Sequence, residues 1–196
     1  KINDIFNNVT KNTSIVFLTF PNIPVEGDID ILFIKKLANF LNRKKILLVI
    51  DEVYFPFNKF STIRLIKKFE NLVVMRSFSK AFGLAGARIG YIVSEEKKIK
   101  IFSNTKGGYE TNMLSASALE FVIDNKEITN KYVTNVSKGF LFLKKKLKNL
   151  KIDYYGGTNS NFIFINFENK ILASKIFKKL KFYKISVRYG YPKPFD

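Results

Sequence analysis

Short apolar runs alternate with amphipathic stretches through the first half of the chain. Four runs have the length and the β-branched content of buried strands: residues 14–20, 46–50, 72–75 and 89–93. Apolar residues recur at helical spacing over residues 31–41, and a shorter helix is predicted around residues 61–69. Alternating strands and helices favour right-handed crossovers, so we predict an α/β fold with a largely parallel mixed sheet flanked by helices.

The second half of the chain follows a different pattern. Residues 112–150 are helical in spacing, with a break near Asn125. The pattern then predicts strand, strand, helix and strand, at residues 152–155, 162–167, 171–180 and 185–188. We therefore expect a large domain over residues 1–120, followed by a connecting helix and a smaller α+β unit over residues 121–196.

Composition removes several kinds of chemistry. The chain contains neither cysteine nor histidine, which excludes disulfides, cysteine- or histidine-based metal sites and histidine-dependent catalytic triads. Any general acid–base step must therefore use Lys, Tyr, Asp or Glu. No apolar stretch is long enough to cross a bilayer, and the first residues lack the apolar core of a signal peptide. We expect a cytoplasmic protein with no membrane partner.

A formal net charge of +18 raises nucleic-acid binding as an alternative. The basic residues are mostly lysine, however, and they are scattered over predicted helix faces rather than gathered in one patch. Arginine is the residue expected for bidentate readout of bases and phosphates. A solvated lysine surface explains the charge better, so we predict no nucleic-acid partner and keep a basic binding protein as the non-enzymatic alternative.

Reactive side chains follow the predicted strands, where ligands bind in parallel sheets. Asp51 and Glu52 end one buried run. After the next run, the hydroxyls of Ser77 and Ser79, a glycine-containing loop and Arg88 provide the donors that a phosphate dianion needs. A lysine in the same loop, Lys80, can bond covalently to an aldehyde near that phosphate. Neither feature is specific alone, because such a segment can also be a simple polar turn.

Taken together, these segments resemble a known family. The run SFSKAFGLAGARIGY, starting at Ser77, resembles the cofactor-lysine motif of fold-type I aminotransferases dependent on pyridoxal 5'-phosphate (PLP). It is most similar to the histidinol-phosphate aminotransferase group, which also contains threonine-phosphate decarboxylase-like members. The run DEVY, starting at Asp51, matches the Asp-Glu-Ala-Tyr motif of the same family. The resemblance extends from about Ile15 to Arg188. Members of this group are longer chains, so both expected domains correspond to partial ones.

The resemblance assigns the chemistry of the cofactor to three residues. Lys80 corresponds to the lysine that forms a Schiff base with PLP and then moves the α-proton of the substrate. Asp51 corresponds to the carboxylate that pairs with the pyridine nitrogen and keeps it protonated. Tyr54 corresponds to the phenol that hydrogen-bonds O3′ of the cofactor.

The resemblance also implies residues that bind anions. Ser77, Ser79 and Arg88 correspond to the phosphate cradle of the cofactor, and Arg188 to an arginine that meets the anionic group of the substrate. For Arg188, an exposed charge at a strand end is the alternative.

One segment departs from the family pattern. The family has Pro-Asn-Asn-Pro-Thr-Gly where this chain has PNIPVEG, starting at Pro21. Asn22 is retained as a candidate cofactor contact, but Ile23 replaces the asparagine that hydrogen-bonds O3′ and cannot do so itself. Either Tyr54 holds O3′ alone or the turn is rebuilt.

The resemblance predicts a PLP-dependent aminotransferase. Such an enzyme moves an amino group between an amino acid and a keto compound, and the similarity to the histidinol-phosphate group makes a phosphorylated compound one candidate. A PLP-dependent decarboxylase of an O-phospho-amino acid and a degenerate, non-catalytic family member remain alternatives. The expected partners are a small amino donor and a keto acceptor, and the expected assembly is a homodimer.

Overall fold

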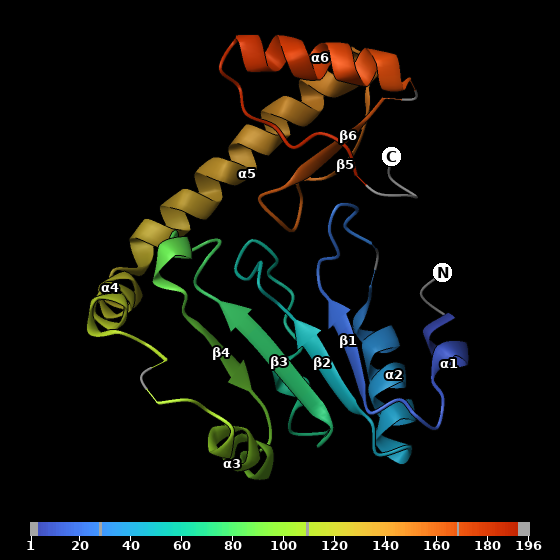
Figure 1. Cartoon of the computed structure of the whole chain (residues 1–196), viewed down its shortest axis with the longest axis vertical. Helices are drawn as coiled ribbons and strands as arrows, with labels where there is room; N and C mark the ends of the chain where they lie inside the picture. The colour runs from blue at the N-terminus through green and yellow to red at the C-terminus, as the bar shows by residue number, and fades with distance from the viewer. Residues whose placement is uncertain (1–3, 28, 109, 168, 192–196) are drawn as a thin grey trace.

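The computed structural model describes residues 4–27, 29–108, 110–167 and 169–191, which form two sheets and their flanking helices (Figure 1). In chain order the elements are α1 (Asp4–Asn8), β1 (Ile15–Thr19), α2 (Ile31–Arg43), β2 (Leu47–Asp51), the 3-10 helix η1 (Ile63–Leu65), β3 (Leu72–Ser77), the 3-10 helix η2 (Ala85–Ala87), β4 (Gly90–Val93), α3 (Glu96–Asn104), α4 (Met113–Asp124), α5 (Lys126–Asn149), β5 (Asp153–Gly156), β6 (Ile163–Asn166) and α6 (Lys170–Phe182).

The larger sheet has the order β1-β2-β3-β4. The first three strands are parallel, and β4 runs antiparallel to β3. This arrangement confirms the predicted α/β fold with a largely parallel mixed sheet. The register places Thr19 beside Asp51 and Asp51 beside Met75, so three strands end at the same edge of the sheet.

The core lies between this sheet and α2. Apolar side chains on one face of α2 are fully buried, as are those that meet them from β2 and β3: Ile34, Leu37, Ala38, Leu41, Leu48, Ile50, Leu72 and Val74. On β1, Val16 and Leu18 pack against this cluster, whereas Ile15 and Phe17 on the opposite face remain exposed. Burial of each large aliphatic side chain contributes about 1.5–3 kcal/mol, so this interface fixes the position of the strand ends.

The second half of the chain contains the predicted break. Asn125 ends α4 and begins α5. The long helix α5 leads away from the large sheet to the antiparallel pair β5–β6 and to α6 (Figure 1). The carboxyl ends of β1, β2 and β3 point toward the β5–β6 pair (Figure 1). The boundary between domains at residue 120 stays a prediction.

Two predicted elements are wrong. The helix expected at residues 61–69 is reduced to the single turn η1, because β-branched residues such as Ile63 and Ile66 favour helices weakly and a buried carboxylate, described below, binds the start of the segment. No strand forms at residues 185–188. Instead, Tyr189 stacks on Phe177 of α6, with ring centroids 4.9 Å apart, so this segment follows α6 rather than extending the sheet.

Candidate active site

Asp51, Tyr54 and Lys80 converge at the carboxyl edge of the large sheet. Asp51 is the last residue of β2, Tyr54 lies in the turn that follows, and Lys80 lies in the loop after β3. The Lys80 Nζ is 5.5 Å from the centroid of the Tyr54 ring, and its charge acts on the Asp51 carboxyl group. All three side chains are partly buried. The three residues that the family resemblance assigned to cofactor chemistry therefore lie together.

The backbone around Asp51 is fixed on both sides. Its carbonyl accepts a hydrogen bond from the Phe20 N–H at 2.8 Å, and the next residue, Glu52, donates its N–H to the Met75 carbonyl at 2.8 Å. The Asp51 Oδ1 accepts a hydrogen bond from the Val53 N–H at 2.9 Å. Among the described residues Oδ2 has no hydrogen-bond partner, so one carboxyl oxygen is available to a ligand.

Burial sets the protonation state of two groups in the site. It raises the pKa of the Asp51 carboxyl above the usual aspartate value, while the Val53 N–H and the charge of Lys80 act in the opposite direction. Burial also raises the pKa of the Tyr54 phenol, and electrostatic interactions with Asp51, Tyr191 and Glu26 raise it further. The Tyr54 phenol therefore keeps its proton at neutral pH and can donate a hydrogen bond.

The predicted phosphate cradle is only partly assembled. The Ser77 Oγ accepts a hydrogen bond from the Ser79 N–H at 3.1 Å and donates one to the Ile89 carbonyl at 3.4 Å. Arg88 adopts a left-handed backbone conformation (φ 55°) and its exposed guanidinium donates to the Ala85 carbonyl at 3.2 Å. Among the described hydrogen bonds none joins Arg88 to either serine. One of its five N–H donors is used in this contact, and the others remain for an anion.

Positions 22 and 23, where the family has two asparagines, differ in their surroundings. Asn22 is exposed, and its Oδ1 accepts a hydrogen bond from the Thr19 hydroxyl at 2.8 Å. This contact closes the turn after β1 rather than reaching toward Lys80. Ile23 is partly buried, and its aliphatic side chain has no hydrogen-bond donor. A role for Asn22 in binding a cofactor stays a prediction.

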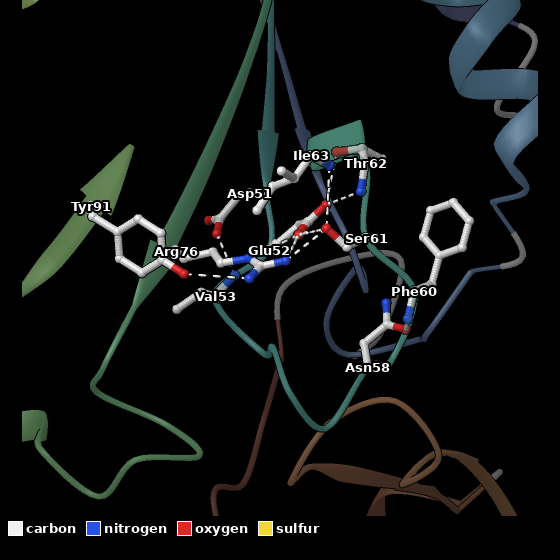
Figure 2. A network of polar contacts seen from close by, with 10 residues as sticks. All are labelled: Asp51, Glu52, Val53, Asn58, Phe60, Ser61, Thr62, Ile63, Arg76 and Tyr91. Atoms are coloured by element: carbon white, nitrogen blue, oxygen red, sulfur yellow. Dashed lines mark hydrogen bonds and ion pairs between the residues drawn. The ribbon is translucent and has the colours of Figure 1, made fainter. Parts of the chain in front are cut away.

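Beneath the site lies a buried ion pair that the sequence analysis did not predict (Figure 2). Glu52 directly follows the last residue of β2, and its side chain is buried, whereas that of Asp51 is only partly buried. The Arg76 Nη2 lies 2.9 Å from the Glu52 Oε2, and the exposed fractions of the two side chains are 9% and 2%. Ser61 donates to the same oxygen at 3.0 Å, and the N–H and hydroxyl of Thr62 donate to Oε1 at 2.6 and 2.8 Å.

Aromatic rings enclose the arginine of this pair. Its guanidinium carbon lies 3.5 Å from the centroid of the Phe55 ring, and its Nη1 donates to the Tyr91 hydroxyl at 3.3 Å (Figure 2). Together the contacts link β2, the turn after it, η1, β3 and β4. The signal available in the sequence was a glutamate inside one motif, Glu52, and an arginine directly before the other, Arg76, but their pairing requires the register of the sheet.

Arg188 contacts an aromatic side chain of its own segment. It is exposed and its guanidinium carbon sits 4.6 Å from the centroid of the Tyr191 ring. Tyr191 in turn acts electrostatically on Tyr54 and contacts the ring of Phe164 at 5.5 Å between centroids. Tyr191 is therefore the link between this C-terminal segment and the site, because it contacts Arg188 and acts on Tyr54. Its role in substrate binding stays a prediction.

The described residues offer no other evident chemistry. No group of three or more Asp or Glu side chains among them is placed to hold a metal ion. None of their helices is long and apolar enough to cross a membrane.

Comparisons with known proteins give a consistent result. Residues 2–193 match the family model described as "Aminotransferase class I and II". The chain is 37% identical over 175 residues to histidinol-phosphate aminotransferase 1 of Carboxydothermus hydrogenoformans, which covers 89% of this chain and 48% of that protein. It is 32% identical over 162 residues to a dihydroxyacetone phosphate transaminase of Campylobacter jejuni, covering 81% and 44%.

A solved structure of a histidinol-phosphate aminotransferase has a similar fold. The structure of histidinol-phosphate aminotransferase from Sinorhizobium meliloti in complex with pyridoxal-5'-phosphate superposes with a TM-score of 0.83 at 19% identity, covering 100% of this chain and 54% of that one. The chain therefore spans about half the length of the curated relatives that it matches.

Proposed function

We propose, on the premise that this chain belongs to the aminotransferase class I and II family, that it carries the PLP site of an aminotransferase. The observation on which the proposal depends is the convergence of Asp51, Tyr54 and Lys80 at one sheet edge, with the Lys80 amine 5.5 Å from the Tyr54 ring. These side chains supply an amine for the aldehyde of PLP, an acid for its ring nitrogen and a phenol for its ring oxygen.

The available groups fit the cofactor. The Lys80 amine can hold the aldehyde covalently. Asp51 has a free carboxyl oxygen for the ring nitrogen, since its other oxygen accepts the Val53 N–H. Tyr54 keeps its phenolic proton, so its hydroxyl can donate a hydrogen bond to a ring oxygen. Ser77, Ser79 and the unused donors of Arg88 suit a phosphate.

Bound PLP supplies an electron sink for the carbanion that forms when the α-proton of an amino acid leaves. The residues of this chain would bind, orient and move protons around it. Asp51, as a carboxylate, would hold a proton at the ring nitrogen. Tyr54 would keep the O3′ side in place without help from residue 23, which is isoleucine. The Lys80 amine, when not bonded to the cofactor, would act as the base that takes the α-proton of the amino acid and returns it to the carbon that had carried the aldehyde.

We infer that the substrate carries a phosphate. Two relatives similar over more than four fifths of this chain are named for phosphorylated compounds, histidinol phosphate and dihydroxyacetone phosphate. Arg188 is exposed and uncommitted to any acidic partner among the described residues, so its guanidinium is available to an anion. This supports an amino group exchange between an amino acid and a phosphorylated keto compound.

Titration of the purified chain with PLP tests the proposal. We expect a visible absorption band in the wild type that is lost in Lys80→Ala, because the band requires the lysine amine. Glu95→Ala, a change at the start of α3 away from the site, should leave the band unchanged. The absence of a band in the wild type, or an equal band in Lys80→Ala, would contradict the proposal.

The reaction class needs a separate assay. With an O-phospho-amino acid as substrate, a decarboxylase releases carbon dioxide and an aminotransferase does not. We expect amino transfer to a keto acceptor without carbon dioxide. Loss of carbon dioxide in step with substrate consumption would favour the decarboxylase.

A homodimer and a cytoplasmic location complete the proposal. Large apolar side chains are exposed at the start of α4, where Met113 is 83% and Leu114 is 85% accessible. Neighbouring exposed apolar side chains of this kind are typical of a surface that binds another protein chain. Sedimentation at increasing protein concentration should reveal a dimer, and a monomer throughout the range would argue against it.

A further inference from the structure

Glu26 lies in the turn after β1 and reaches a distant part of the chain. Its carboxylate accepts hydrogen bonds from the connection between β5 and β6, which lies more than 130 residues further along the sequence. The Thr158 N–H lies 3.2 Å from Oε2 and the Asn159 N–H lies 3.0 Å from the same oxygen. The buried Ser160 hydroxyl donates to Oε1. One carboxylate therefore binds three donors, and bonds to a charged acceptor are stronger than neutral ones.

The connection is also held from α5. The Lys144 Nζ donates to the Thr158 hydroxyl at 2.6 Å. Gly157 has a φ of +66°, and a Cβ at this position would lie 3.0 Å from the Phe140 ring and 3.2 Å from the Lys144 side chain. Only glycine fits this approach without strain. The contacts with α5 hold the β5–β6 connection in place. Glu26 therefore joins the turn after β1 to a segment that is itself anchored to a helix.

The turn that contains Glu26 begins beside the candidate site, because the Phe20 N–H donates a hydrogen bond to the Asp51 carbonyl at 2.8 Å. The charge of Glu26 is one of the influences that raise the pKa of the Tyr54 phenol, after burial, Asp51 and Tyr191. The same turn contains Ile23, whose side chain cannot hydrogen-bond a cofactor. The side chain of residue 23 therefore offers no hydrogen bond toward the site, whereas Glu26 binds the β5–β6 connection.

We propose that Glu26 is a positioning residue that fixes the turn after β1 against the β5–β6 connection and so holds this turn in place beside Asp51 and Tyr54. The inference rests on the proposed function, because the position of the turn matters to PLP only if the site binds it. Glu26 need not contact the cofactor. It acts through the turn that also contains Ile23.

Amide hydrogen exchange, measured by NMR on the full chain, tests the contact itself. In Glu26→Ala, exchange at Thr158 and Asn159 should accelerate by about tenfold or more, the factor expected from loss of a hydrogen bond to a charged group. Glu26→Gln retains the shape and one acceptor oxygen, so we expect an intermediate effect. The matched control is Glu95→Ala, which removes another carboxylate that accepts a backbone N–H, that of Lys97, and should leave Thr158 and Asn159 unchanged.

Two further measurements separate positioning from mere stability. The first is the titration of the Tyr54 phenol by NMR with ring-labelled tyrosine, assigned with Tyr54→Phe, where Glu26→Gln should lower the phenol pKa. The second is the dissociation constant for PLP, which should rise about tenfold in Glu26→Ala and less in Glu26→Gln, following the lost charge-assisted bonds. Neither should change in Glu95→Ala.

The outcomes distinguish the two proposals. If the wild-type chain binds no PLP, the proposed function fails, and the exchange and phenol titration still decide whether Glu26 holds the turn beside Tyr54. Unchanged exchange in Glu26→Ala would overturn the contact. Faster exchange with an unchanged Tyr54 titration and an unchanged PLP affinity would overturn the positioning role.

Discussion

Burial and neighbouring charge act in opposite directions on the carboxyl group of Asp51. Burial is the larger influence, so the pKa of Asp51 in the folded chain lies above that of an ordinary aspartate, although Lys80 opposes the shift. In an acid with a raised pKa, the folded state binds more protons than the unfolded state between the two pKa values. Stability therefore falls as pH rises from the ordinary aspartate value to the raised one, and the loss persists above it.

Substitution of Asp51 should reveal this dependence. Relative to Asp51→Asn, we expect the wild type to lose stability as pH rises through that window, after which the difference becomes constant. Urea unfolding at a series of acidic to neutral pH values measures it. A gain of wild-type stability relative to Asp51→Asn as pH rises would mean that the pKa is lowered in the folded state.

The buried pair of Glu52 and Arg76 gives a second residue-scale prediction. Glu52→Gln leaves the arginine charged and without a counterion in a site where its side chain is 9% exposed, which costs about 3–5 kcal/mol in the free energy of unfolding. Denaturant unfolding measures the loss. The control is Glu96→Gln, which breaks the exposed pair with Lys100 and should cost no more than about 0.5 kcal/mol. Equal losses in the two variants would contradict the structural role.

Motif residues could be predicted from the sequence because their spacing along the chain carries the signal. Asp51, Tyr54 and Lys80 were identified in this way, and the structure brings them together. Glu26 and Arg76 could not be assigned, because each depends on a partner distant in sequence, at Ser160 and Glu52 respectively. Such contacts follow from strand register and from the approach of two separate units.

At the scale of elements, the start of α2 gives the next prediction. The Asp30 Oδ1 accepts a hydrogen bond from the Phe33 N–H at 2.6 Å, which satisfies one of the free donors of the first helical turn. Asp30→Ala should lower the free energy of unfolding by about 1 kcal/mol, and Asp30→Asn, which can also cap, by much less. Thermal unfolding of the three proteins measures this, and an equal loss in both variants would show that charge rather than capping matters.

Elements with a strong apolar period were predicted well, and weakly patterned ones were not. The helix α2 and the strands of the large sheet match their predicted positions within a few residues. The helix α3 was not predicted, because its sequence EKKIKIFSN has few apolar residues and none is buried. The segment at residues 185–188 has the alternation of a strand, but the stacking of Tyr189 on Phe177 holds it near α6.

For the whole molecule, net charge dominates the long-range electrostatics. With 34 basic and 16 acidic residues, the formal charge of +18 destabilises the compact state by self-repulsion. Raising NaCl from low concentration to about 0.15 M shortens the screening length to about 8 Å. We therefore expect the urea midpoint of unfolding to increase over this range, and a decrease would indicate that attractive ion pairs outweigh the repulsion.

The central claim is that Lys80, among many lysines, is the one that reacts with PLP. Reduction with borohydride in the presence of PLP, followed by peptide mapping with mass spectrometry, tests this most directly because it fixes the bond at its site. We predict one dominant adduct on Lys80, which disappears in Lys80→Arg. Adducts spread over surface lysines, or a dominant adduct at another lysine, would contradict the account.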